Sequence, residues 1–175
     1  MGKSYKEILN NINTFIFDVD GVLTDGSLLL LDDGQMARSM NTKDGYALQL
    51  AIKKGYPVIV VSGGGADGAR MRLNKLGITE VHFQVTNKKQ VLDAFLQANN
   101  ILPAQVLFMG DDIPDYMVMK QAGLPCCPAD AVPEIKNISK YIAAAKGGNG
   151  CVREVIEKVL KLNGHWDLDT SVASK

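Results

Sequence analysis

Short apolar runs alternate with segments of helical length along most of this 175-residue chain. The three strongest runs are 14–17, 57–61 and 106–109, and each stops at a polar loop that contains glycine. Apolar runs of this length bounded by turn residues are typical of buried strands. Strands that alternate with helices of about ten residues form βαβ units. The sequence therefore predicts an α/β fold with a mainly parallel sheet.

The remaining elements are expected between these strands, in one domain that spans residues 1–175. A capping box formed by Ser4 and Glu7 predicts a first short helix. The polar tail 164–175 is expected to be mobile unless it docks. The other expected helices are 44–54, 67–76, 88–99, a segment ending at 122, and 151–162, and the weaker strands are 81–84, 124–127 and 141–143.

Residues 26–41 are expected to form a protruding β-hairpin. Leu28–Leu31 is followed by an Asp-Asp-Gly turn and then by a second strand, 35–40. Four consecutive leucines cannot all face one small core. They indicate either a strand that is covered on both faces or a strand buried against another subunit.

Composition excludes several function classes. The formal charge is zero, which argues against a nucleic-acid partner, and no apolar run approaches the roughly 20 residues of a membrane span. The start of the chain turns polar too soon for a secretory signal. The three cysteines lack the spacing of a zinc site, so we expect buried free thiols and a cytoplasmic location.

Polar side chains follow each strong strand, at the edge where the carboxyl ends of parallel strands meet. Several carboxylates at one edge would repel each other, and Mg²⁺, which prefers oxygen ligands, resolves that conflict. If strand geometry continues through residue 19, the first two carboxylates point the same way. The residues concerned are Asp18 and Asp20 after the first strand, Ser62 and Gly63 after the second, and Asp111, Asp112 and Asp115 after the third.

An anionic site that holds Mg²⁺ suits phosphate esters. Asp18 is expected to attack phosphorus and form an aspartyl-phosphate, and Asp20 to exchange a proton with the leaving group and then with water. Ser62, the Gly63 amide and a lysine are expected to hold the phosphoryl oxygens. Lys88, at the start of a helix, is the first choice for that lysine, and Lys89 is the alternative.

Each of these signals also has an ordinary structural explanation. Asp-x-Asp-Gly is usually a turn, Ser-Gly-Gly-Gly is often a simple loop, and Gly-Asp-Asp-x-x-Asp suits a solvated surface turn. Lys88 alone is most simply a charge on a helix face. The order of these features along the chain, and their common place at strand ends, favour the catalytic interpretation.

The constellation resembles the haloacid dehalogenase-like phosphohydrolases over residues 15–154. The resemblance implies a Rossmann-like three-layer domain. By position, Asp18 is similar to the family nucleophile and Asp20 to the acid/base, whose carbonyl also binds metal. Ser62 and Lys88 match the phosphate-binding positions. Asp111 matches the metal-binding aspartate, with Asp112 and Asp115 as acidic support.

Three further motifs resemble the subgroup of 3-deoxy-D-manno-octulosonate (KDO) 8-phosphate phosphatases: DGVLTDG from residue 20, NTKDG from residue 41 and GGNGCVRE from residue 147. This resemblance implies a Mg²⁺-dependent hydrolase that releases the sugar acid KDO for lipopolysaccharide synthesis. It also implies a core without a cap domain, assembled as a homotetramer through hairpin 26–41.

One position departs from the subgroup, which commonly has arginine where this chain has Gly64. The sugar-acid substrate therefore stays open, and 2-keto-3-deoxy-nononate 9-phosphate is the alternative. Arg72 and Lys75 are candidates for the substrate carboxylate, although a salt bridge and a solvated helix face explain them equally well. From other classes, a non-catalytic oligomerisation module and a protein phosphatase remain as alternatives. The glycines at 147–150 suggest either an anion site before a helix or a flexible turn.

Overall fold

The computed structural model describes residues 5–65 and 67–173 of the chain. Its helices and strands follow the alternation that the sequence predicts. The helices are α1 (Tyr5–Asn10), α2 (Thr42–Lys53), α3 (Asp67–Lys75), α4 (Lys88–Asn99), α5 (Tyr116–Met119), α6 (Pro133–Ile138) and α7 (Cys151–Leu162). The strands are β1 (Thr14–Phe17), β2 (Leu29–Leu30), β3 (Met36–Ala37), β4 (Val58–Val61), β5 (Glu80–His82), β6 (Val106–Met109), β7 (Leu124–Cys127) and β8 (Tyr141–Ile142).

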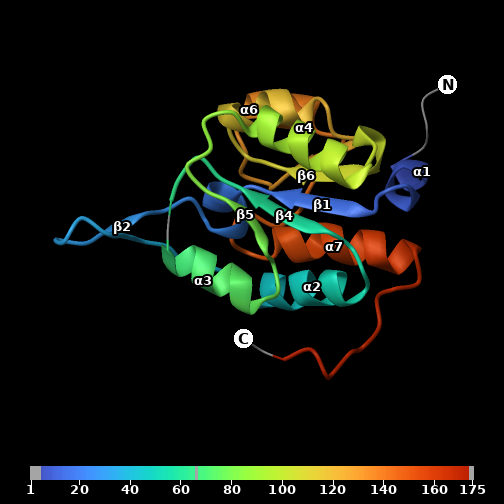
Figure 1. Cartoon of the computed structure of the whole chain (residues 1–175), viewed down its shortest axis with the longest axis horizontal. Coiled ribbons are helices and arrows are strands. Elements are labelled where there is room, and N and C mark those ends of the chain that lie inside the picture. The colour runs from blue at the N-terminus through green and yellow to red at the C-terminus, as the bar shows by residue number, and fades with distance from the viewer. Residues whose placement is uncertain (1–4, 66, 174–175) are drawn as a thin grey trace.

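Six of these strands form one parallel sheet in the order β5-β4-β1-β6-β7-β8. The first strand, β1, lies inside the sheet between β4 and β6 (Figure 1). The chain adds β4 and β5 on one side of β1 and then returns to add β6, β7 and β8 on the other. Ligands of open α/β sheets bind beside such a reversal, at the carboxyl ends of the strands.

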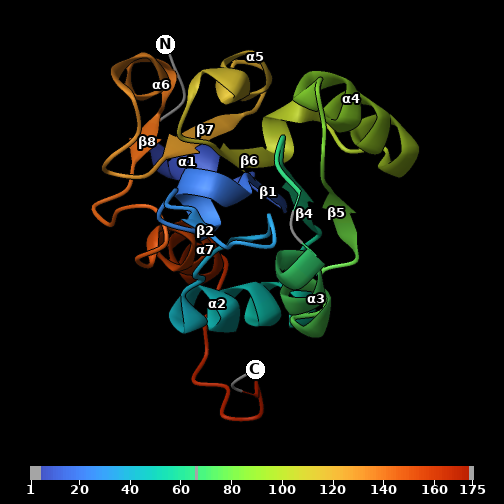
Figure 2. The same cartoon turned by 90° about the vertical axis from the view of Figure 1, so that its left-hand side faces the viewer.

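Helices cover both faces of the sheet and give the three layers that the sequence predicts. Figures 1 and 2 show α4, α5 and α6 above the sheet and α2, α3 and α7 below it. Side chains alternate between the two faces. In β1, Phe15 and Phe17 pack into the core on the α2 and α7 side, and Ile16 packs into the core on the α4 side. This double burial holds β1 rigidly in place.

The predicted hairpin is present and projects from the body of the domain (Figure 1). Its paired segments, β2 and β3, are two residues long and antiparallel, so they are shorter than expected. All four leucines of 28–31 are exposed in the single chain, by 43% to 70%. The described structure is a single protein chain without a cap domain, as predicted.

Two local differences from the sequence prediction have simple causes. Helix α2 starts at Thr42 rather than at 44, because the Asn41 side chain accepts a hydrogen bond from the Lys43 amide and caps it. Helix α6 was not predicted, since it has only six residues. Ser4 of the expected capping box lies outside the described residues.

The segment after α7 runs beside α2. Lys53 and Lys54 form ion pairs with Asp169 and Asp167, and Tyr46 stacks edge-on against Trp166. The mobility of this tail stays a prediction. The described helices include none with the length and apolar character needed to span a membrane. All three cysteines are buried free thiols.

Candidate active site

The loops that follow β1, β4 and β6 meet at the carboxyl edge of the sheet. The backbone pairing extends one residue past β1 and β4: the Asp18 amide donates to the Met109 carbonyl at 3.0 Å, and the Ser62 amide donates to the His82 carbonyl at 2.9 Å. The first polar residue of each of these two loops is therefore held by the sheet itself.

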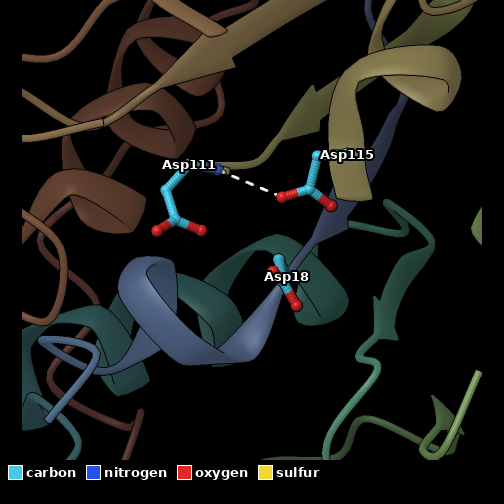
Figure 3. Close-up of side chains that lie close together, drawn as sticks. All are labelled: Asp18, Asp111 and Asp115. Atoms are coloured by element: carbon cyan, nitrogen blue, oxygen red, sulfur yellow. Dashed lines mark hydrogen bonds between the residues drawn. The ribbon is translucent and has the colours of Figure 1, made fainter. Parts of the chain in front are cut away.

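Three carboxylates from two of these loops converge (Figure 3). Asp18, Asp111 and Asp115 each have an oxygen within 4.8 Å of an oxygen of the other two. The ammonium group of Lys88 enters the same cluster, 2.9 Å from Asp18 Oδ2 and 2.7 Å from Asp115 Oδ1. Three negative charges thus face one positive charge in a region largely closed to solvent.

This crowding appears in the pKa values of two carboxyls. Burial, and then repulsion from Asp115, raise the pKa of Asp18 to about 7, although Lys88 opposes the shift. Burial, and then repulsion from Asp18 and Asp115, raise the pKa of Asp111 to about 7. For Lys88, burial lowers the pKa, but the attraction of Asp115 and Asp18 outweighs it, so the pKa lies above its ordinary value. The single positive charge of Lys88 is therefore too little to balance the three carboxylates of the cluster.

The donor set fits a small divalent cation. Among the described residues, Asp111 Oδ1 is buried without a hydrogen-bond partner. An unsatisfied carboxylate oxygen is costly in the interior unless a cation meets it. Mg²⁺ binds carboxylate oxygens and keeps water or phosphate ligands, and neither histidine nor cysteine takes part here. Asp18 and Asp111 are the residues best placed to hold it.

Asp115 is the most deeply buried residue of the cluster, and its role differs from that of the other two. Its side chain is completely buried. One oxygen accepts the bond from Lys88, and the other accepts a hydrogen bond from the Asp111 amide at 3.1 Å (Figure 3). Asp115 therefore fixes both Lys88 and the loop that presents Asp111. Asp112 lies outside the cluster, exposed, and accepts a hydrogen bond from the Ile113 amide.

Asp20 is not one of the described residues that form that cluster. Strand β1 ends at Phe17, and Val19–Leu23 forms a kinked turn in which Asp20 and Gly21 have non-helical backbone angles, so strand geometry does not continue through residue 19 as expected. The Asp20 carboxylate pairs instead with Arg38 of the hairpin. Nothing local to residue 38 in the sequence pointed to this residue, since a single arginine in a hairpin is most simply a solvated charge.

The loop after β4 lies beside Asp20. Ser62 is buried, and its hydroxyl oxygen accepts a hydrogen bond from the Gly64 amide at 3.2 Å. Beyond this loop, a cleft of about 1000 Å³ opens between the hairpin and α3. We call it the hairpin–α3 cleft. Arg38 and Arg72 line it, whereas Lys75 is exposed on α3 and is not among the described residues that line it.

The motifs around residues 41 and 147 contact each other and the loop after β1, so they support the site structurally. The Asp44 carboxylate accepts a hydrogen bond from the Arg153 amide at 2.7 Å, which joins α2 to the start of α7. A Cβ atom at Gly147 would lie 2.0 Å from the Gly21 carbonyl oxygen, so only glycine fits against the loop after β1. The Gly147 and Gly148 amides donate to Asp130 and to the Val22 carbonyl. These amides are therefore used within the protein, and the segment is a packing element rather than an anion site.

Comparison with known proteins places this arrangement in context. A family model described as haloacid dehalogenase-like hydrolase matches residues 66–155. The 3-deoxy-D-manno-octulosonate 8-phosphate phosphatase KdsC of Escherichia coli (strain K12) is 34% identical over 157 residues, which cover 90% of this chain and 84% of that protein. KdsC of Yersinia pestis is 35% identical over 150 residues, 86% of this chain and 80% of its own length.

Solved structures agree with the sequence relatives. The crystal structure of the 3-deoxy-D-manno-octulosonate 8-phosphate phosphatase of Yersinia pestis superposes with a TM-score of 0.89 at 33% identity, over 91% of this chain and 86% of that one. The enzyme of Moraxella catarrhalis, solved in complex with a magnesium ion, a phosphate ion and a KDO molecule, gives a TM-score of 0.87 at 28% identity, over 90% of both chains.

Proposed function

Because this chain belongs to the haloacid dehalogenase-like hydrolases, in the branch of the KDO 8-phosphate phosphatases, we propose that it hydrolyses KDO 8-phosphate to KDO and phosphate. The chain is a phosphoric monoester hydrolase, and its cofactor is Mg²⁺. The observation that carries the proposal is the cluster of three carboxylates, two buried and one half-buried, and one buried lysine at the reversal point of the sheet.

The proposed reaction has two displacements at phosphorus. An Asp18 oxygen forms a bond to phosphorus while the bond to the sugar oxygen breaks, and Asp20 gives that oxygen a proton. A water molecule then attacks phosphorus and loses a proton to Asp20, the bond to Asp18 breaks, and inorganic phosphate leaves. Asp18, Asp111 and the Asp20 carbonyl would hold Mg²⁺, which would supply positive charge to the phosphoryl oxygens.

Lys88 and Ser62 would hold the phosphoryl group between these two steps. The Lys88 ammonium lies 2.9 Å from Asp18, so it is positioned to contact an oxygen of a phosphoryl group attached there. The buried Ser62 hydroxyl and the Gly63 amide belong to the adjacent loop. Asp115 takes no part in bond making and holds Lys88 and Asp111 in place.

The substrate assignment draws on the named activities of the relatives and on the hairpin–α3 cleft. The cleft has room for a sugar acid, and Arg72 at its wall, with Lys75 on the same helix, is a candidate for the substrate carboxylate. The alternative is 2-keto-3-deoxy-nononate 9-phosphate, which has one more carbon and the same chemistry. A non-catalytic oligomerisation module is the further alternative, and the retained Asp18, Lys88 and Asp111 weigh against it.

The proposal also covers the oligomeric state and the cellular location of the enzyme. We propose one domain, residues 1–175, that forms a homotetramer through hairpin 26–41. We also propose that its tail, 164–175, is mobile, because the ion pairs that join it to α2 are partly exposed and therefore weak. The exposed leucines of the hairpin support this, because an apolar surface of this kind is usually covered in an assembly. The free cysteines support a reducing cytoplasm.

The test is a phosphate-release screen over 2-keto sugar-acid phosphates, with Mg²⁺ and with EDTA. We expect Mg²⁺-dependent turnover that is highest on KDO 8-phosphate. Asp18→Asn should lower kcat by at least about a thousandfold without changing the assembly, because the amide is a poor nucleophile. Equal and poor turnover of the KDO and nononate phosphates would contradict the substrate assignment. Undiminished hydrolysis by Asp18→Asn would contradict the mechanism.

A further inference from the structure

The hairpin contributes one side chain to the reaction site. The guanidinium of Arg38 binds both carboxylate oxygens of Asp20, with Nε 2.6 Å from Oδ1 and Nη2 3.1 Å from Oδ2. The third nitrogen, Nη1, donates to the Met36 carbonyl of the same hairpin at 3.1 Å. All three nitrogens are therefore engaged, and the plane of the guanidinium is fixed relative to the carboxylate.

This pair differs from an ordinary surface salt bridge. The Arg38 side chain is only 7% exposed, although it comes from a hairpin whose neighbouring side chains are open to solvent. Exposed pairs with one contact contribute little, whereas two-point arginine–carboxylate contacts fix geometry as well as charge. In the described structure, both hydrogen bonds to the Asp20 side chain come from Arg38.

A glycine at position 64 makes room for the pair. A Cβ atom at Gly64 would lie 3.0 Å from Asp20 Oδ2 and 3.2 Å from Arg38 Nη2. Any side chain there would push against both partners. Gly64 has no unusual backbone conformation that requires glycine, so the space it leaves is the feature that matters at this position.

We propose that Arg38 is a positioning residue, which aims the Asp20 carboxyl at the leaving-group oxygen of the substrate. The proposal rests on the proposed function, in which Asp20 gives a proton to a sugar oxygen. A sugar alkoxide is a poor leaving group, so its departure depends on that proton being delivered in the right place. A shift of about 1 Å in such a group costs on the order of a hundredfold in rate.

The position of Arg38 also suits contact with the departing sugar. Arg38 lines the hairpin–α3 cleft while its guanidinium holds Asp20, so it lies at the boundary between the phosphoryl site and the space for the leaving group. Lys88, in contrast, forms its ion pairs among the described residues with Asp18 and Asp115, in the cluster where phosphorus would be attacked. Lys88 therefore lies on the phosphorus side of the bond that breaks, and Arg38 lies on the side of the leaving-group oxygen.

The test compares two kinds of substrate. We would assay wild type, Arg38→Met and Arg38→Lys on two substrates. The first is the sugar-acid phosphate, which is an alkyl phosphate. The second is p-nitrophenyl phosphate, an aryl phosphate whose leaving group departs without a proton. The quantity measured is kcat/KM, because it reports only the steps up to the first displacement. Misfolding lowers both values equally, so the ratio of alkyl to aryl kcat/KM isolates the positioning role. Lys161→Gln, which affects a surface ion pair on α7, is the control.

We expect Arg38→Met to lower the ratio by about ten- to a hundredfold, since only the alkyl substrate depends on the proton. Arg38→Lys should lower it less, because lysine keeps the charge but not the two-point geometry. Gly64→Ala should act in the same direction as Arg38→Met, and Lys161→Gln should leave the ratio unchanged. A ratio within threefold of wild type in Arg38→Met would overturn the inference.

The outcomes separate this inference from the proposed function. A wild-type enzyme that cleaves other alkyl phosphates but no sugar-acid phosphate would refute the substrate assignment, and the ratio would then be measured on the alkyl phosphate that it does cleave. A wild-type enzyme that cleaves aryl phosphates alone would refute the role of Asp20 as an acid, and the role of Arg38 with it.

Discussion

The ammonium nitrogen of Lys88 lies 2.9 Å from Asp18 Oδ2, in a contact where the lysine side chain is 5% exposed and the aspartate side chain 10%. Each side chain makes burial of the other tolerable, because an isolated buried charge is far more costly than a paired one. Lys88 is therefore expected to stabilise this region, in addition to the phosphate-binding role that we propose for it.

Lys88→Met should destabilise the protein strongly in the absence of metal at pH 8. Removal of one partner from a buried ion pair costs about 3–5 kcal/mol, since the remaining carboxylates lose their compensating charge. Urea unfolding in EDTA measures the effect, and added Mg²⁺ should restore part of the loss. Lys89→Met is the matched control, because the Lys89–Asp93 pair is exposed and should contribute less than about 1 kcal/mol. Equal effects of the two substitutions would contradict the interpretation.

Magnesium should stabilise the protein more at pH 8 than at pH 6. In the metal-free protein, the pKa values of Asp18 and Asp111 are raised from 3.8 to about 7. Because these values are higher folded than unfolded, the stability they contribute is present below about pH 4 and is lost as pH rises through 7. Metal binding needs the ionised carboxylates, so Mg²⁺ affinity should rise over the same range.

Thermal unfolding from pH 5.5 to 8.5, with EDTA and with Mg²⁺, checks this prediction. The gain in Tm on adding Mg²⁺ should increase with pH in wild type. It should be small and nearly independent of pH in Asp111→Asn, which lacks one of the two ligands. A gain in wild type that stays constant across the range would show that these carboxyls do not control binding.

Asp44→Asn should become progressively more favourable as pH rises. Burial raises the pKa of Asp44 from 3.8 to about 6, against the effect of the Arg153 and Gly150 amides. The charged form is thus disfavoured in the folded state, and wild type loses stability between about pH 4 and pH 7. Asparagine keeps an oxygen for the Arg153 amide and carries no charge.

The difference in unfolding free energy, variant minus wild type, should rise by up to about 3 kcal/mol between pH 4 and pH 8. Urea unfolding at each pH gives this difference. Asp33→Asn, at an exposed turn of the hairpin, is the control and should give a flat difference. The prediction fails if the curves for the two variants run parallel.

Leu30→Lys should reduce the size of the assembly. Leu30 is 70% exposed in the single chain and lies in the hairpin that we propose as the subunit contact. A charge there is costly to bury and should shift a tetramer to smaller species. Light scattering after gel filtration measures the mass. Leu168→Lys is the control, because Leu168 is fully exposed in the tail. An unchanged mass in Leu30→Lys would exclude the hairpin as the contact.

The sequence was sufficient to predict the frame of the site. The apolar runs that became β1, β4 and β6 are short, buried and bounded by glycine, so their strand character was clear. In a parallel sheet their carboxyl ends must share one edge, and this brought Asp18 and Asp111 together without any knowledge of tertiary contacts.

The parts that were missed depend on contacts between distant segments. The pairing of Arg38 with Asp20 follows from how the hairpin folds back over the site, which no local pattern encodes. Asp115 appeared only as acidic support beside Asp111, whereas its complete burial and its bond to Lys88 result from the short helical turn Ile113–Asp115. The motif residue Asp44 proved to join two helices, since helix packing and not catalysis requires it there.

The place of β1 in the sheet has a consequence for how the enzyme is made. Its two partners are residues 58–61 and 106–109, and the loop that carries Asp18, the proposed nucleophile, rests on Gly147 and Gly148, close to the start of α7. On the ribosome, the loop around Asp18 is synthesised early, but the residues that support it are complete only once Gly147 and Gly148 have emerged. Nascent chains arrested before Gly147 should therefore release no phosphate from an aryl ester. A growing polypeptide would then be inactive towards the phosphorylated metabolites around it until this segment has been made.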